Sequence, residues 1–414
     1  MRRRVVVTGL GCVTPVGNDV ASTWHALLEG NSGGAPVTRF DASSHKVNFA
    51  CEVKHFDPAL YMDRKEVKRS DLYTQFALAG AVQAMRDAGL EGGGFDPFRT
   101  GVIVGSGIGG ISTFETQHNV LRDSGPGRIS AFFVPMFIGD IAAGVVSMRF
   151  GAKGPNFATQ SACATSAHAI GSAFRHIQYG DADVMIAGGS EAAISAMAMG
   201  GFANMTALSF RNDSPATASR PFDATRDGFV LGEGAGVVIL EELGHAQGRG
   251  ARIYGELAGY GLTGDAYHLT GQPENHEGLQ RSMKAALADA GMPDGAGVQY
   301  VNAHGTSTPM NDSNEIRAIR AAFGEHAEEL NVSSTKSATG HMLGAAGAVE
   351  AIFCLLAITN GVIPPTINLT SQDPECDLNC TPLTPVRREV SAALSNSSGF
   401  GGHNASLVVR RLAG

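Results

Sequence analysis

Short apolar runs of strand length alternate along the chain with longer segments of helical character. Two such runs, residues 101–105 and 298–303, each follow a segment closed by a glycine, Ala84–Leu90 and Ala286–Met292. A glycine just past the last turn is a common helix cap. The order helix, turn, strand therefore occurs twice, and the apolar run Val5–Val7 predicts an earlier first strand.

A second pair of segments supports this internal repeat. Residues 156–161 and 331–336 each precede a stretch rich in Ala, Gly and Ser, which predicts a helix buried on every side. Repeated helix–strand units predict an α/β fold in which helices cover two sheets. We place the boundary near 248–250, which divides the chain into halves 1–250 and 251–414. No low-complexity linker separates them, so we expect a shared interior.

Composition and charge narrow the class of protein. The 414 residues exceed the usual limit of about 250–300 for a single core. A hydrophobic share of 43% with only 17% charged residues excludes a disordered chain. The net charge of −8 argues against nucleic acid as a partner.

The sequence predicts a cytoplasmic protein without a membrane segment. Gly9 and Gly11 interrupt the apolar stretch that a secretion signal would need after Arg2–Arg4. The long uncharged stretches contain Asn, Gly or Pro, which a bilayer segment would avoid. The six cysteines form no CxxC pair, as is usual in a reducing compartment. Cys376 and Cys380 have no nearby histidines, so we predict no metal site.

Cys163 is the first candidate for chemistry. It lies between a strand-like segment, 154–160, and the small-residue segment 164–174. The free N–H groups and the dipole at a helix start both favour thiolate over thiol, which is what a nucleophile needs. The alternative is a small buried core residue, the commonest fate of a free cysteine.

Two histidines occupy similar positions. His304 follows the apolar strand that ends at Ala303, and His341 enters a second small-residue helix. Active sites of α/β proteins gather at strand ends and helix starts. The alternative for each is a hydrogen-bonded, partly buried imidazole.

Together these segments resemble the β-ketoacyl-acyl-carrier-protein synthases, most closely the elongating synthase II branch. The resemblance extends from 5–11 to 396–404 and includes the surroundings of Cys163, His304 and His341. It also includes Arg220–Asp223, Asp227–Phe229, Gly232–Gly234 and the loop from Lys336 to His341. It implies a thiolase-like αβαβα layered sandwich of two pseudo-repeated halves, and a homodimer.

The resemblance also implies a reaction, the decarboxylative condensation of fatty-acid elongation. Cys163 would accept an acyl group from an acidic acyl carrier protein, with the N–H groups of Cys163 and Phe400 as the oxyanion hole. His304 and His341 would stabilise the enolate formed when malonyl-carrier loses CO2, and Lys336 would support their electrostatics. No cofactor is implied beyond the phosphopantetheine arm of the carrier.

Further residues follow from the resemblance, each with an ordinary structural alternative. Residues implied to bind the acyl chain and the pantetheine arm are Ile108, Phe133, Phe202, Phe229, Thr270, Thr306 and Thr308. Residues implied to dock the carrier share one basic helical face, with Arg128 in addition: Arg64, Lys65, Lys68 and Arg69. The alternatives are core packing, ordinary loop threonines and a solvated helix face.

Some positions depart from the family pattern. Ser398 stands where the family usually has Phe, which we expect to loosen the packing behind Phe400. Asn311 replaces the usual Gly before Asp312. Residues 105–110 fit the GxGxxG pattern, but they lie about 100 residues in and no second strand follows, which argues against dinucleotide binding.

Three other functions are alternatives for a chain with these motifs. A ketosynthase of a type II polyketide pathway would share these motifs. A CoA-dependent thiolase would need a second cysteine in the C-terminal Gly-rich loop, and residues 399–404 contain none. A non-catalytic chain-length partner subunit would lack the nucleophile, so Cys163 with both histidines argues against it.

Overall fold

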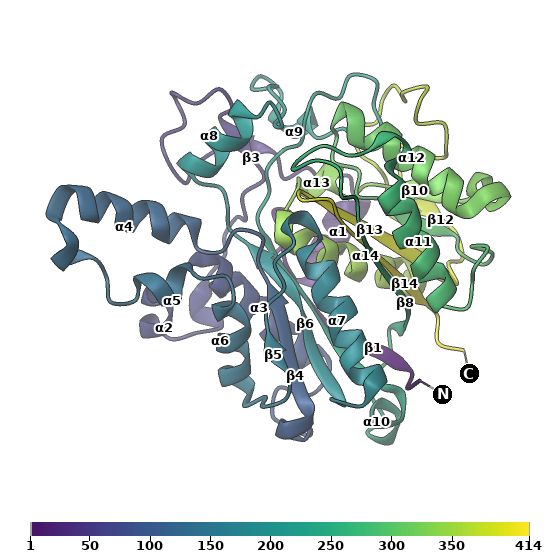
Figure 1. The fold of residues 1–414 in the computed structure, drawn as a ribbon, viewed down its shortest axis with the longest axis horizontal. Coiled ribbons are helices and arrows are strands. Elements are labelled where there is room, and N and C mark those ends of the chain that lie inside the picture. Colours follow the sequence, from purple (N-terminus) through teal and green to yellow (C-terminus); the bar gives the residue numbers. More distant parts are fainter. Residues whose placement is uncertain (1, 414) are drawn as a thin grey trace.

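The computed structural model describes residues 2–413, and its centre is one ten-stranded sheet (Figure 1). The strands lie in the order β10 (Asn331–Ser333), β9 (Tyr300–Asn302), β13 (Ala392–Gly399), β14 (His403–Arg410), β8 (Gly255–Gly264), β1 (Val5–Val13), β7 (Gly234–Glu242), β6 (Val184–Glu191), β4 (Thr100–Gly105) and β5 (Asn156–Phe157). Small two-stranded sheets pair β2 (Ala35–Pro36) with β3 (Phe49–Ala50) and β11 (Val362–Ile363) with β12 (Val386–Arg387).

The large sheet consists of two five-stranded halves with the same topology. In the N-terminal half β4 is parallel to β5 and β6, and β7 is antiparallel to β6 and β1. In the C-terminal half β9 is parallel to β10 and β13, and β14 is antiparallel to β13 and β8. The halves join where β1 and β8 pair at Val6 with Glu256 and Val7 with Gly255. The two expected sheets are therefore one continuous sheet.

Helices cover both halves and also fill the space between them (Figure 1). The outer helices of the N-terminal half are α3 (Leu72–Asp87) and α6 (Ile141–Phe150), and those of the C-terminal half are α11 (Glu277–Asp289) and α12 (Pro309–Phe323). The middle helices are α7 (Thr165–Tyr179) and α14 (Ala346–Asn360), which contact strands of both halves. This is the αβαβα sandwich of the thiolase-like fold.

Further α-helices lie around this sandwich. They are α1 (Val20–Leu28), α2 (Arg64–Lys68), α4 (Ile111–Ser124), α5 (Phe133–Phe137), α8 (Ala196–Asn204), α9 (Pro215–Ala218), α10 (Leu243–Gly248) and α13 (Lys336–Thr339). Helix α4 projects furthest from the body in Figure 1.

Strand residues alternate between separate cores. On β4, Val102 and Val104 pack with the outer helices, whereas Ile103 joins the middle layer. On β13, Ala393 faces the middle layer and Leu394 the outer core of the C-terminal half. Successive side chains of a strand point to opposite faces, so both strands are buried along nearly their whole length because helices cover both faces.

The middle helix α14 is buried on nearly every side and is apolar except for Glu350 and its last residues. Residues 343–360 are long and apolar enough to cross a membrane, but 89% of this stretch is buried inside the protein. It packs against β7 on one side and β13 on the other. Its composition therefore reflects its position between the two halves of the sheet.

Glycines hold the outer helices close to the sheet at matching positions of the repeat. A Cβ on Gly11 of β1 would lie 2.0 Å from the Gly80 carbonyl oxygen of α3. A Cβ on Gly261 of β8 would lie 2.0 Å from the Ser282 carbonyl oxygen of α11. The helices also end alike, since Gly89 and Gly291 both adopt positive φ, +69° and +74°.

We expect Gly261→Ala to lower the free energy of unfolding by about 1–3 kcal/mol, because the new methyl group collides with a helix backbone that cannot rotate away. Gly201→Ala is the matched control: it lies in α8 and a Cβ there would have no atom within 4 Å, so it should be neutral or stabilising by up to about 1 kcal/mol. Chemical denaturation of both variants measures the difference. Equal stabilities would contradict the packing argument.

Candidate active site

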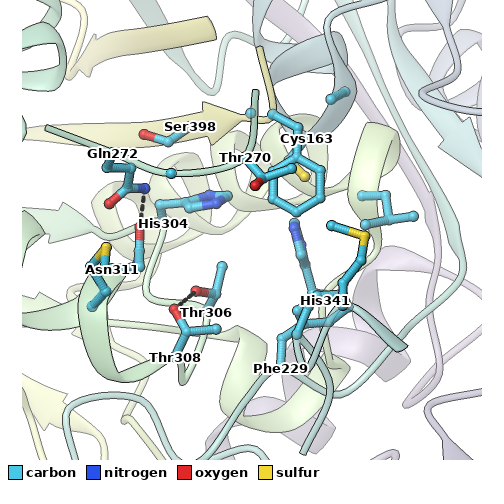
Figure 2. A pocket seen from close by; sticks show the side chains of 18 of the residues that line it. Cys163, Phe229, Thr270, Gln272, His304, Thr306, Thr308, Asn311, His341 and Ser398 are labelled. Carbon is cyan, nitrogen blue, oxygen red and sulfur yellow. Dashed lines mark hydrogen bonds between the residues drawn. The ribbon is translucent and has the colours of Figure 1, made fainter. Parts of the chain in front are cut away.

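A cavity of about 450 Å³ opens where the two halves meet at the starts of α7 and α14. Its walls include Cys163 from the N-terminal half and His304, His341 and Phe400 from the C-terminal half. Figure 2 shows Cys163 and the two imidazoles around the same hollow. The three chemically distinctive residues predicted from sequence, far apart along the chain, thus share one site.

Cys163 lies in a 3-10 turn, Ala162–Ala164, directly before α7. Ala162 has a positive φ of +49°, so the chain turns sharply into the helix. The residue is 8% exposed, and burial raises the pKa of its thiol to about 12. The Lys336 ammonium and the N–H groups of Phe400 and Cys163 act in the opposite direction. The structure therefore opposes the expected thiolate: burial outweighs the helix start, and the group is a thiol at neutral pH.

His304 and His341 stand edge to face. Their ring centroids are 5.2 Å apart with an interplanar angle of 86°. Burial lowers the pKa of each well below the ordinary value, and the Lys336 ammonium lowers both further. Both imidazoles are therefore neutral at physiological pH, and each can donate one ring N–H.

The loops that carry the histidines are held by buried partners. The Glu315 carboxylate on α12 accepts from the N–H groups of His304 and Gly305 at 2.8 and 2.7 Å. The His341 N–H donates to the Val230 carbonyl at 2.7 Å. Phe229 packs edge-on against the His341 ring, with the ring centroids 5.4 Å apart. The backbone of both histidines is thus held by buried protein groups.

Lys336 begins the four-residue helix α13 and is 1% exposed. Its ammonium forms an ion pair with the Glu350 carboxylate on α14. Burial raises the pKa of Glu350 to about 7, against the opposing effect of Lys336. The Lys336 cation lowers the pKa of Cys163, which favours the nucleophilic thiolate. It also lowers the pKa of both histidines, which favours their neutral forms.

Phe400 lies in the tight connection between β13 and β14 and lines the cavity. Its backbone N–H and the N–H of Cys163 itself both lower the pKa of the Cys163 thiol. Gly399, just before it, permits this approach, since a Cβ there would lie 2.6 Å from the Ser161 carbonyl oxygen. The two donors predicted for an oxyanion hole therefore both lie near the Cys163 sulfur.

The cavity brings together most of the residues predicted to bind substrate. Its lining contains Ile108, Phe202, Phe229, Thr270, Thr306 and Thr308. The Thr306 and Thr308 hydroxyls hydrogen-bond each other at 3.0 Å. Phe133 is not part of this lining: it packs on α5 against Phe137, with ring centroids 5.8 Å apart.

Sequence reasoning missed other residues of the lining. Gln272 donates to Asn311 at 2.8 Å (Figure 2). Asp265 and His276 lie on the same connection between β8 and α11 as Gln272. Leu343 has a positive φ of +45°, matching Ala162 in the other half. The connection between β8 and α11 is polar and irregular, so no hydrophobic periodicity in the sequence indicates its role.

The basic residues predicted to dock a carrier are found on and beside α2. Arg64, Lys65 and Lys68 are helical, and Arg69 is its C-cap residue. The Arg69 guanidinium lies 4.5 Å from the Phe132 ring centroid. Arg128 is exposed in a separate 3-10 turn. These residues remain a predicted docking surface.

The GxGxxG segment has no free phosphate cradle. The Glu191 carboxylate accepts from the N–H groups of Gly107 and Ile108 at 2.8 and 3.1 Å. It also accepts from the Gly344 N–H at 3.0 Å, across the middle layer. These donors are occupied by a protein carboxylate, which opposes a dinucleotide site.

Comparison with known proteins agrees with this site. Residues 2–246 match the family "Beta-ketoacyl synthase, N-terminal domain", and residues 254–370 match "Beta-ketoacyl synthase, C-terminal domain". A nucleophile-bearing half and a histidine-bearing half define a condensing enzyme of the thiolase-like class. The chain belongs to the β-ketoacyl synthase family.

Its relatives are similar over nearly their whole lengths. The 3-oxoacyl-[acyl-carrier-protein] synthase 2 of Staphylococcus aureus (strain N315) is 52% identical over 99% of this chain and 98% of its own. That of Synechocystis is 50% identical with the same coverage. Among solved structures, a type II polyketide ketosynthase in complex with its acyl-carrier protein is 37% identical, with TM-score 0.91 and full coverage of both chains. The ishigamide ketosynthase/chain length factor is 34% identical, with TM-score 0.92 and full coverage of both chains.

The raised pKa of Cys163 predicts its reactivity. Labelling by iodoacetamide should rise about tenfold per pH unit from about pH 6 to pH 9, because the thiolate fraction grows without levelling off. Peptide mass analysis of the label at Cys163 measures this rate, with Cys163→Ala as the control for other sites. A plateau below about pH 8 would contradict the assignment of a resting thiol.

Proposed function

We propose that this protein elongates acyl chains on a carrier protein, by decarboxylative condensation of an acyl thioester with malonyl-carrier in fatty-acid synthesis. The observation that carries the proposal is the meeting of the Cys163 thiol and two neutral imidazoles in one cavity. The identity of 50–52% over nearly the whole chain to 3-oxoacyl-[acyl-carrier-protein] synthase 2 proteins favours fatty-acid elongation.

The first half-reaction moves the acyl group to the enzyme. The Cys163 sulfur attacks the thioester carbonyl, the carrier thiol leaves with a proton, and an acyl-Cys163 thioester remains. The N–H groups of Cys163 and Phe400 receive the negative charge that develops on the carbonyl oxygen. Because the thiol is protonated at rest, its proton must leave during the attack.

The second half-reaction forms the carbon–carbon bond. Malonyl-carrier loses CO2, and the electron pair of the broken bond gives an enolate with charge on the thioester oxygen. Neutral N–H donors at His304 and His341 stabilise that oxygen, a role that suits imidazoles whose pKa is low. The enolate carbon attacks the acyl carbonyl, the tetrahedral intermediate expels the Cys163 thiolate, which takes up a proton from solvent, and the β-ketoacyl-carrier is the product.

The partners follow from the same proposal. The substrates arrive on the phosphopantetheine arm of an acidic acyl carrier protein, with no further cofactor and no metal ion, and the enzyme works in the cytoplasm. The basic residues on and beside α2 bind the carrier protein in this proposal. A homodimer is supported by the position of β5 at the edge of the sheet and by exposed apolar side chains near it, including Phe157 at 42% and Met148 at 76%.

Mutations should separate the half-reactions. Cys163→Ala should lower acyl transfer more than about 10³-fold but retain malonyl decarboxylation, because the enolate donors remain. The double variant His304→Ala/His341→Ala should lose decarboxylation. Cys12→Ala, another buried cysteine, is the control and should transfer acyl groups normally. Radiolabelled CO2 release and intact-protein mass measure both steps. An acyl-enzyme formed at the normal rate by Cys163→Ala would refute the assigned nucleophile.

Charge reversal should test the carrier surface. Lys65→Glu/Lys68→Glu should raise KM for carrier-linked substrate about tenfold, with little change for a small pantetheine thioester. The effect should shrink with added salt, because exposed charges are screened over about 8–10 Å. Lys284→Glu, an exposed lysine on α11, is the matched control. Equal losses with both substrates would show that the surface does not bind the carrier.

A further inference from the structure

A buried polar cluster lies behind the loop that carries Phe400. The Asn404 side-chain oxygen accepts from the Ser398 hydroxyl at 3.0 Å and from His276 Nε2 at 3.1 Å. The Asn404 side-chain nitrogen donates to the Asp265 carboxylate at 2.6 Å. His276 and Asn404 are 0% exposed and Ser398 is 6% exposed. We call these four residues, Asp265, His276, Ser398 and Asn404, the Asn404 cluster.

The cluster has one consistent arrangement of donors and acceptors. Because Asn404 faces the Asp265 carboxylate with its nitrogen, its oxygen must face Ser398 and His276. His276 therefore carries its hydrogen on Nε2, and its buried Nδ1 has no hydrogen-bond partner among residues 2–413. Burial lowers the pKa of His276, which keeps the imidazole neutral despite Asp265 3.9 Å away.

The cluster ties two cavity-lining segments together. Asp265 and His276 belong to the connection between β8 and α11, and Ser398 and Asn404 flank the loop at Phe400. Backbone bonds run in parallel, from the Asp265 N–H to the Gly402 carbonyl at 2.9 Å and from the Gly401 N–H to the Leu269 carbonyl at 2.7 Å. The position of the Phe400 N–H therefore depends on this junction.

His276 occupies its place at a conformational cost. It has a positive φ of +46°, and its neighbour Asn275 has +60°. Both are conformations that suit glycine, and a buried imidazole there needs a compensating contact. The contact it makes is with the oxygen shared by Ser398, the residue that replaces the family's phenylalanine. The Ser398 hydroxyl and the imidazole both lie within hydrogen-bond distance of the same Asn404 oxygen, so a ring at position 398 would meet the imidazole.

We propose that His276 is a positioning residue that packs beside Ser398 and fixes Asn404, so that the Phe400 N–H stays close to Cys163. The proposal rests on the proposed function, in which that N–H belongs to the oxyanion hole. Within this cluster the Ser398 hydroxyl is buried and hydrogen-bonded, and the looser packing expected from its small size stays a prediction.

Four variants test the proposal: His276→Gly, Ser398→Phe, the double variant and His276→Gln. His276→Gly should lower acyl transfer to Cys163 about tenfold, since complete loss of an oxyanion donor costs about 10²–10³. Ser398→Phe should lose as much, because its ring competes with His276 for one space. The double variant should regain most of the loss. His276→Gln, which keeps an N–H donor, should be less impaired than His276→Gly.

Asn275→Gly is the matched control. It relieves the same backbone conformation at an exposed neighbour and should leave acyl transfer unchanged. Malonyl decarboxylation should change less than about twofold in all variants, because its donors lie on other elements, and circular dichroism and melting curves report folding. A merely structural role for His276 would reduce both steps in parallel with stability.

The result that overturns the proposal is independence of the two positions. If Ser398→Phe is equally harmful in the wild-type and in the His276→Gly background, or if His276→Gly alone transfers acyl groups at the normal rate, His276 positions nothing. If the wild-type enzyme itself forms no acyl-Cys163, the proposed function fails instead. The wild-type acylation assay, run first, distinguishes the two failures.

Discussion

The close packing of α7 and α14 between the two halves of the sheet determines where the chemistry lies. A Cβ on Gly347 of α14 would lie 3.0 Å from the Ala167 Cβ of α7, so only small side chains fit where these helices begin. The turns before both helices, with Ala162 and Leu343 at positive φ, therefore come together at the cavity. Cys163 and His341 reach one site because their helices must start side by side.

Burial then decides the charge states in that site. It raises the pKa of the Cys163 thiol and lowers those of His304 and His341, so the three groups that face substrate are neutral at rest. The buried charge of Lys336 is paired with Glu350 on α14. Such a site stabilises negative charge only as it develops on a substrate oxygen, which is the requirement of both half-reactions.

Local signals were sufficient to predict much of the fold. The helix ends at Gly89 and Gly291 and the small-residue segments after Cys163 and His341 are encoded within a few neighbouring residues, and the structure confirms the repeat. The two halves of the sheet join through β1 and β8, near Val6 and Glu256. These segments lie far apart in the sequence, so no local pattern predicts that they pair.

The same distinction holds for the active site: residues within local motifs could be predicted, and residues that meet from separate loops could not. The family motifs located Cys163, His304, His341, Lys336 and Phe400, which the structure places around one cavity or directly behind it. Phe133 lies outside the lining of this cavity in the single chain, and its contact with the acyl chain stays a prediction. The resting thiol was missed because the helix-start argument considered the nearby dipole and omitted burial. The Asn404 cluster was missed because its members come from separate loops.

The central claim is that one cavity takes an acyl group on Cys163 and joins it to a decarboxylated malonyl unit. Incubation of the wild-type protein with acyl-carrier and malonyl-carrier, followed by mass analysis of the carriers, tests it most directly. The account predicts a β-ketoacyl-carrier two carbons longer than the primer, with release of CO2 and free carrier. Acyl-carrier and malonyl-carrier recovered unchanged, beside an enzyme that stays unacylated, would contradict it.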